Sequence, residues 1–266
     1  MPVLEESEDI AVRHQVMLER LKAGEHETAK DEGSAIEEAA IALLISLRVR
    51  SAGDLKKKEM ADLARRVRGA ASAQLDSYFE SLRGRISDLA EYEAGFEARA
   101  IGRVVGRGVT VANPSNALSY VLNLPMGHSG ESVDKFLRTW KQSELDKLEG
   151  LIRQAWANGD SIDDLVRAIQ GDGGLRFSDG WTNQFNRRNE ARIDTLLQHV
   201  SGAAKESTWL ANAELIDAYK WVSVLDSRTT DICRSLSGRV FPVGKGPLPP
   251  QHYRCRSTVV PSIIEL

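Results

Sequence analysis

Two cysteines and a histidine near the C-terminus are the residues of this chain best suited to chemistry. They follow the pattern Cys233-x18-His252-x2-Cys255, and no other cysteine occurs in the chain. Thiolate sulfur and neutral imidazole nitrogen are the usual zinc ligands, and structural zinc sites take four of them. Asp226 or Asp231 could supply the fourth. The spacing therefore indicates a metal site at Cys233, His252 and Cys255, with Asp226 as the candidate fourth ligand and zinc as the candidate cofactor.

The same residues also fit arrangements without a metal ion. Cys233 and Cys255 could be buried thiols beside a hydrogen-bonded His252, or they could form a disulfide, which a reducing cytoplasm disfavours. A catalytic pair would use Cys233 as nucleophile, His252 as base and Asp226 to orient the base. The neighbouring residues have strand and turn character and show no oxyanion-type loop, so we expect no catalytic residue here. The metal, thiol and disulfide alternatives stay open.

Asp226 also has a structural interpretation. It ends an apolar segment and precedes Ser-Arg-Thr-Thr, so its carboxylate can accept backbone N–H bonds and start a short helix that contains Cys233. Arg228 and Arg256 are the cations available to pair with it. We favour this structural network over catalysis.

Further residues surround the cysteines at fixed short spacing, from Trp221 to Pro261. This block resembles the C-terminal motif of the phage Mu protein F-like family of minor head (head-morphogenesis) proteins. The matching residues are Trp221, Asp226, Arg228, Thr229, Cys233, Leu236, Gly238, Pro250, His252, Cys255, Arg256 and Pro261. We interpret Trp221, Arg228, Gly238, Pro250 and Arg256 as structural members of the motif.

Three positions depart from the family pattern. Thr230 stands where the family often has its first cysteine, Tyr253 replaces the proline after the histidine, and Ser257 replaces the last cysteine. The joint loss of cysteine at 230 and 257 suggests that these two positions normally work as a pair. Cys233 and Cys255 are then a second unit.

The resemblance implies a function that the composition does not. Members of the family are minor head components that bind at or near the portal vertex, enter the procapsid, and act in DNA packaging or ejection. It implies the portal protein as partner, with the major capsid or scaffolding protein, packaged DNA and further copies of the chain as other candidates. Some relatives carry a toxin or enzyme domain after the motif. Because this chain ends at Leu266, we expect an assembly role, no enzymatic activity, and a location in the virion after synthesis in the host cytoplasm.

The composition limits the alternatives. The chain has 266 residues, 42% of them hydrophobic, and a formal charge of −3, which argues against wrapping nucleic acid as its main task. No run approaches the ~18–20 apolar residues that span a bilayer, so we expect no membrane partner. Two rival functions remain: a zinc-supported nucleic-acid-binding module that contacts the genome, and a Cys-His hydrolase.

Apolar spacing predicts a mainly α fold. Residues 1–32 suggest a loose or short helical lead, and a helix is expected to open at Ser34. Two further helical runs follow, at 55–67 and 75–96, and the second carries an apolar seam from Leu75 to Phe96 interrupted by Glu93. We expect residues 1–110 to form a helical region for portal docking or self-association.

The second half is expected to be a separate domain. Breakers make residues 111–130 a linker, and the head-morphogenesis domain then covers 131–266. Helices are expected over 133–156, after an N-cap at Ser161, and over 181–213. Three candidate strands, at 221–225, 239–243 and 257–260, build a small α+β Cys/His module from about residue 219.

Overall fold

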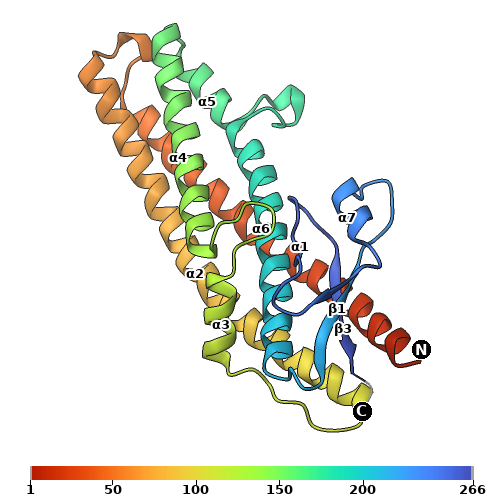
Figure 1. Cartoon of the computed structure of the whole chain (residues 1–266). Coiled ribbons are helices and arrows are strands. Elements are labelled where there is room, and N and C mark those ends of the chain that lie inside the picture. The colour runs from red at the N-terminus through yellow and green to blue at the C-terminus, as the bar shows by residue number, and fades with distance from the viewer. Residues whose placement is uncertain (1, 265–266) are drawn as a thin grey trace. The chain divides into compact units, whose positions relative to one another are not determined.

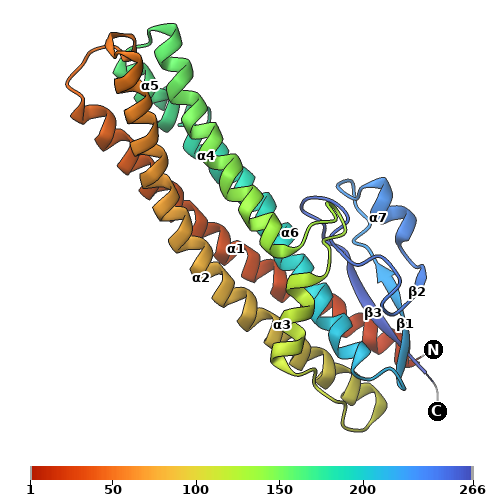
Figure 2. The same ribbon diagram turned by 60° about the vertical axis from the view of Figure 1, so that its left-hand side comes forward.

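The structure, a computed structural model, describes residues 2–264 and is mainly helical with a small C-terminal sheet (Figures 1 and 2). The helices are α1 (Pro2–Ser46), α2 (Lys57–Val105), α3 (Pro114–Asn123), α4 (Val133–Asn158), α5 (Ile162–Gln170), α6 (Trp181–Leu210) and α7 (Asp231–Leu236). The strands are β1 (Ile216–Val222), β2 (Val240–Pro242) and β3 (Thr258–Ile263). This architecture confirms the expected mainly α fold with a terminal α+β module. No helix in the described part of the chain is long and apolar enough to cross a bilayer.

The expected loose lead at residues 1–32 is wrong, because α1 is one continuous helix from Pro2. Leu18 is fully buried on this helix, and the buried positions around it include His14, Gln15 and Lys22. Because polar residues occupy several buried positions of α1, apolar residues do not recur there every three or four positions. A prediction that counts apolar residues alone therefore misses the first half of α1.

From Lys57 onward, the two expected runs at 55–67 and 75–96 are parts of the single helix α2, and Leu55 lies just before it. Its seam is confirmed, since Leu75, Phe79 and the apolar positions that follow are buried as far as Leu89. Phe96, at the end of the seam, is partly exposed. Glu93, the polar interruption, is fully buried.

Helix α3 lies inside the segment expected to be irregular. Asn113 caps it, accepting the backbone N–H of Ser115 on its side chain, and Pro114 occupies the first turn. Asn-Pro indicates a helix start as readily as a turn, so the breaking effect of proline alone does not predict this helix. The expected cap of α5 is confirmed, because Ser161 and Asp164 form a reciprocal capping box.

The chain folds into two compact units, each assembled from segments far apart in sequence. Unit 1 comprises residues up to 23, 83–135 and 191–266, and unit 2 comprises 24–82 and 136–190. The predicted division into 1–110, 111–130 and 131–266 follows the sequence, whereas α1, α2 and α6 each contribute to both units.

Unit 2 is a helical bundle with polar ties between its helices. The Trp140 indole donates to Asn189 Oδ1 at 2.7 Å, linking α4 to α6. Arg188 Nη2 lies 2.6 Å from Oε2 of the buried Glu144. At the end of the bundle, the Trp156 indole donates to the carbonyl oxygen of Leu55.

Unit 1 contains the sheet, in the order β2-β1-β3 with both pairings antiparallel. Tyr219 on the central strand pairs with Phe241 on β2 and with Pro261 on β3. The core beneath this sheet includes Trp209 and Trp221 together with Ile101 from α2. The first strand begins earlier than expected, at Ile216, and its predicted end at 225 is wrong. Val224 and Leu225 lie beyond the strand and are largely exposed.

The C-terminal half of α6 carries polar side chains into the interior of unit 1. Ser201 donates to Glu93 Oε2 at 2.7 Å, and His14 Nε2 lies 2.7 Å from Glu93 Oε1. Burial alone would raise the pKa of Glu93. Hydrogen bonds with His14 and Ser201 and the nearby charge of Lys205 outweigh burial, so the pKa of Glu93 lies below its usual value. Glu93 is therefore an ionised carboxylate that joins α1, α2 and α6.

We predict that Glu93→Ala lowers the free energy of unfolding by about 3–5 kcal/mol, because it leaves buried His14 and Ser201 without their shared acceptor. Glu91→Ala is the matched control, since Glu91 is exposed on the same helix, and it should change stability by less than about 0.5 kcal/mol. Urea unfolding followed by tryptophan fluorescence measures both. Equal effects of the two substitutions would contradict a structural role for the buried carboxylate.

A second prediction concerns His199, whose buried Nε2 donates to the Val121 carbonyl oxygen at 3.0 Å. Burial lowers the pKa of His199 from 6.5 to about 4. As the pH falls from about 6.5 to about 4, the unfolded chain binds a proton that the folded chain does not. Stability should therefore fall by about 3 kcal/mol over this window. In His199→Gln this part of the decline should disappear, as unfolding measured at several pH values would show. Parallel profiles for both proteins would refute the assignment.

Candidate metal centre

Helix α7 and its contacts position Cys233. Thr230 is the N-cap, and its hydroxyl accepts the Cys233 N–H at 3.4 Å. The Ser223 hydroxyl donates to the Cys233 carbonyl oxygen at 2.8 Å, while the Trp221 indole donates to that same hydroxyl. Trp221, expected to be a structural motif residue, thus connects the central strand to the helix of the first cysteine.

The loop between β2 and β3 supplies His252 and Cys255. This loop lies against α6 in unit 1: the Arg254 N–H donates to Thr195 Oγ1 at 3.2 Å. Gly202 allows a further close approach, since a Cβ there would lie 3.2 Å from the Pro249 carbonyl oxygen. The Cys255 N–H returns to the His252 carbonyl oxygen and closes a turn that places both side chains on one side.

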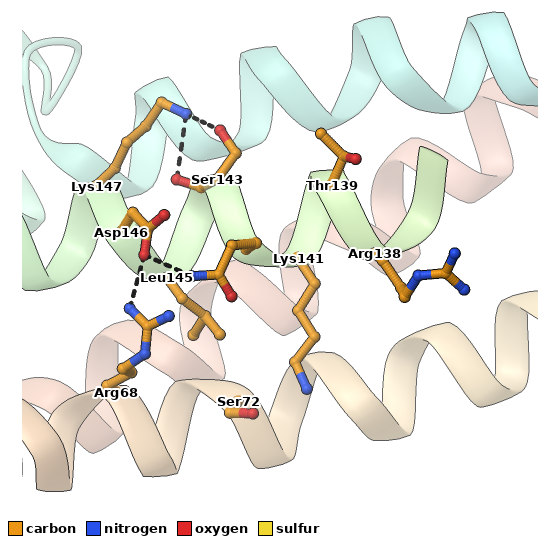
Figure 3. Close-up of a pocket in the computed structure, with 10 residues that line it drawn as sticks. Arg68, Ser72, Arg138, Thr139, Lys141, Ser143, Leu145, Asp146 and Lys147 are labelled. Atoms are coloured by element: carbon orange, nitrogen blue, oxygen red, sulfur yellow. Dashed lines mark hydrogen bonds and ion pairs between the residues drawn. The ribbon is translucent and has the colours of Figure 1, made fainter. Parts of the chain in front are cut away.

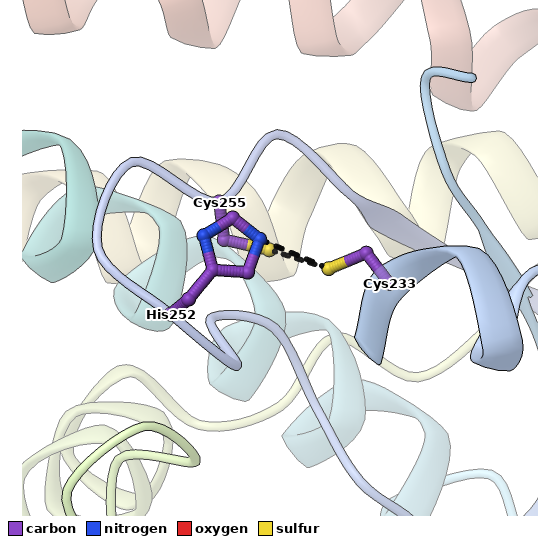
Figure 4. A group of neighbouring side chains, drawn as sticks. All are labelled: Cys233, His252 and Cys255. Carbon is purple, nitrogen blue, oxygen red and sulfur yellow. Dashed lines mark hydrogen bonds between the residues drawn. The ribbon is translucent and has the colours of Figure 1, made fainter. Parts of the chain in front are cut away.

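The structure brings the three predicted residues together (Figure 4). Cys233 Sγ lies 3.2 Å from His252 Nε2 and 3.6 Å from Cys255 Sγ, and all three ligand atoms lie within 4.8 Å of one another. Both cysteines are buried and free, so the structure contains the pair as thiols and not as a disulfide. We call Cys233, His252 and Cys255 the Cys/His group.

The environment distinguishes the two sulfur atoms. A hydrogen bond from Cys233, together with backbone N–H groups of Gln251 and Ser257, lowers the pKa of the Cys255 thiol. The same thiol–thiol contact and burial raise the pKa of Cys233. Cys255 is therefore the sulfur that carries negative charge more readily.

His252 is held in one tautomer. Its Nδ1 lies 2.8 Å from the carbonyl oxygen of Tyr253. A carbonyl oxygen can only accept, so Nδ1 donates, and in the neutral imidazole it is Nε2 that presents its lone pair to the sulfur atoms. Sequence reasoning did not foresee this contact, because the acceptor is a backbone atom.

Asp226 is not part of the Cys/His group. Its two carboxylate oxygens lie 2.7 and 2.8 Å from Arg256 Nη2, and Oδ1 accepts the Arg228 backbone N–H at 2.9 Å. These contacts hold the pKa of Asp226 at about 2. The expected pairing of Asp226 with arginine is present, but Asp226 starts a turn and does not cap α7.

The remaining motif residues and departures also fall around this group. Gly238 has a left-handed φ of 81° and donates its N–H to the Trp221 carbonyl oxygen, which a residue with a side chain would do only under strain. Thr230 and Ser257, where the family pattern has cysteine, each place a hydroxyl against Cys233. Their position next to Cys233 could not be deduced from spacing alone.

Chemically, the arrangement offers one soft binding position made of two sulfur atoms and one imidazole nitrogen. It does not reproduce a nucleophile–base–carboxylate series, because His252 Nδ1 is engaged by a backbone carbonyl and Asp226 by Arg256. The hydrolase arrangement that used Asp226 to orient His252 is therefore wrong in its third member.

An open groove in unit 2, between α2 and α4, was not expected from the sequence (Figure 3). Arg68, Arg138, Lys141 and Lys147 are among the side chains that line it. Acidic partners neutralise several of them: Arg68 contacts Asp146 and Glu149 at 2.9 Å each, and Lys141 contacts Asp76 at 2.5 Å. The groove is thus a mixed-charge surface and not a concentrated anion site.

We predict that Arg256→Gln raises the pKa of Asp226 from about 2 towards the ordinary aspartate value of about 3.9. Arg228→Gln is the matched control, because the Arg228 side chain is 3.8 Å away and largely exposed, and its backbone N–H bond would persist. A carboxyl-detected NMR titration gives the pKa values in both variants. An equal rise in the two would show that Arg256 has no special role.

Comparison with known proteins matches a family model to part of the C-terminal half of the chain. The family model described as Phage Mu protein F like protein matches residues 146–260, less than half of the chain but including the whole Cys/His group. No curated protein and no solved structure matches the chain. The match covers the segment in which the sequence motif lies and confirms the resemblance. Residues 146–260 are thus similar to the Phage Mu protein F-like family, which suggests a phage head-morphogenesis protein.

Proposed function

We propose that this protein is a minor head protein that joins the procapsid at the portal vertex and acts there in head assembly, DNA packaging or DNA ejection, without catalytic turnover. The observation that carries the proposal is the family match over residues 146–260. The portal protein is the proposed main partner. Major capsid or scaffolding protein, packaged DNA and further copies of the chain are the other partners that such a position offers.

The structure supports an assembly role through the way the motif residues are used. Trp221, Asp226 and Arg256 bond within the module, and Gly238 shapes its turn. These residues maintain a fold, so they leave contact with a partner to other surfaces.

The helical region 1–110 offers such a surface on α1. Val12 and Val16 are about half exposed and lie one helical turn apart. Apolar residues at this spacing suit docking of a helix into a groove of a partner. We therefore assign portal docking to this face of α1.

The alternative of a nucleic-acid-binding module rests on two arginines beside the Cys/His group. Arg228 and Arg254 line a small depression together with Cys233 and His252, and their side chains are 75% and 53% exposed. Cations at such a place could meet phosphate, and binding would then weaken steeply with salt. Two arginines in a chain of net charge −3 make this the second choice.

The proposal is tested by following the full-length protein in the infected host. It should be present in purified procapsids and virions and absent from procapsids made without portal protein, as quantitative mass spectrometry would show. Presence in portal-less procapsids would refute the portal assignment, and absence from both particles would refute a head protein. Deleting residues 1–110 is no clean test, because Ile101 belongs to the core around Trp209 and Trp221.

Point variants locate the docking face. The double change Val12→Glu and Val16→Glu should reduce incorporation into procapsids at least about tenfold, since two charges at a docked apolar face cost several kcal/mol. Val240→Glu is the matched control, because Val240 is equally exposed on β2. Circular dichroism establishes that both variants fold. Normal incorporation of the folded double variant would move docking away from α1.

A further inference from the structure

We propose that Cys233, His252 and Cys255 bind one zinc ion, with the fourth ligand supplied by solvent. Zinc–sulfur bonds of about 2.3 Å and zinc–nitrogen bonds of about 2.0 Å in a tetrahedron place sulfur atoms about 3.8 Å apart and sulfur and nitrogen about 3.5 Å apart. The observed separations are 3.6 Å between the sulfurs and 3.2 Å from Cys233 Sγ to His252 Nε2. These two separations differ from the tetrahedral values by a few tenths of an ångström, and Cys255 Sγ and His252 Nε2 lie within 4.8 Å of each other. A single ion can therefore be shared by the three atoms after small shifts of the side chains.

The ligands are already prepared for a metal. The Tyr253 carbonyl oxygen holds the Nδ1 proton of His252 and leaves Nε2 as the ligand atom, which is the usual support of a metal-bound histidine. Backbone N–H groups of Gln251 and Ser257 point at Cys255 Sγ and can donate hydrogen bonds to a sulfur ligand there. Two sulfurs with one imidazole form a soft donor set that suits zinc better than magnesium or calcium.

The fourth position opens towards solvent. A small depression is lined by Cys233 and His252, and by Arg228, Thr229, Arg254 and Ser257 among others. The carboxylate of Asp226 cannot complete the site without leaving Arg256. A water molecule or small anion in this depression would complete the tetrahedron, next to the arginine side chains.

A bare pair of thiols is the competing arrangement, in which the Cys233 thiol donates a hydrogen bond to His252 Nε2. A zinc ion would use His252 as its third protein ligand. The bound ion would also affect the fold. The ion would tie α7, through Cys233, to the loop of His252 and Cys255, so it should stabilise unit 1.

Zinc analysis of the full-length protein, purified under reducing conditions, tests the proposal. We expect one zinc per chain by elemental analysis, a thiolate-to-metal charge-transfer band after cobalt substitution, and a lower Tm after chelation. Cys233→Ser, Cys255→Ser and His252→Ala should each weaken zinc binding by at least the roughly 10- to 100-fold that loss of an outer-shell partner costs. Asp226→Asn is the control and should keep zinc.

Ser257→Cys gives a test that does not depend on a damaged variant. Ser257 lines the same depression, and its hydroxyl contacts Cys233, so a thiolate there could take the fourth position. Zinc affinity, measured by competition with a chromophoric chelator, should rise about tenfold or more. Folded wild-type protein that binds no zinc when reduced, or that is isolated with a Cys233–Cys255 disulfide, would overturn the proposal. Loss of zinc in Asp226→Asn, or no gain in Ser257→Cys, would overturn the assigned ligand set.

Discussion

The C-terminal half of α6 is buried on every side, and the rest of unit 1 has to supply partners for its buried polar groups. From residue 195 to residue 209 every position is buried, although several are polar or charged. A buried polar group without a partner costs about 1–3 kcal/mol, and a charge costs more. Each neighbouring element therefore has to bring a matching group: α2 brings Glu93 to Ser201, and Glu97 to the Trp209 indole. α3 brings the Tyr120 hydroxyl to Glu206.

The same helix fixes the loop that carries the Cys/His group. Thr195 accepts the backbone N–H of Arg254, and Gln198 donates to the carbonyl oxygen of Ser257, at the two sides of Cys255. Lys205 reaches Thr258 at the start of β3. The positions of Cys255 and His252 are thus set by polar contacts to α6 as well as by the sheet. Gln198 also contacts Gln15 and Lys22 of α1, so the N-terminal helix and the C-terminal loop share one buried network.

How far the sequence could predict this structure follows from the kind of signal each part carries. The seam of α2 and the cap of α5 were predictable, because apolar spacing and capping boxes are local patterns. The start of α1 was not, since His14, Gln15 and Lys22 take buried positions that only distant partners explain. The proximity of Cys233, His252 and Cys255 followed from the types of the residues. Asp226 is not a member of the Cys/His group because its carboxylate binds Arg256 instead. The spacing of residues in the sequence cannot decide between these two partners.

The residues that identify the family and those that could contact a partner are different sets. The hydrogen-bonding groups of Trp221, Gly238 and Arg256 are used inside the module, so the pattern of these residues specifies a fold. Residues on a surface that recognises a portal or capsid protein need not make such internal bonds. Their types can vary as long as the module beneath them stays folded. Val12 and Val16, proposed above as the docking face, are exposed and lie outside the matched segment. The proposed docking face is therefore separate from the residues by which the resemblance to the family is recognised.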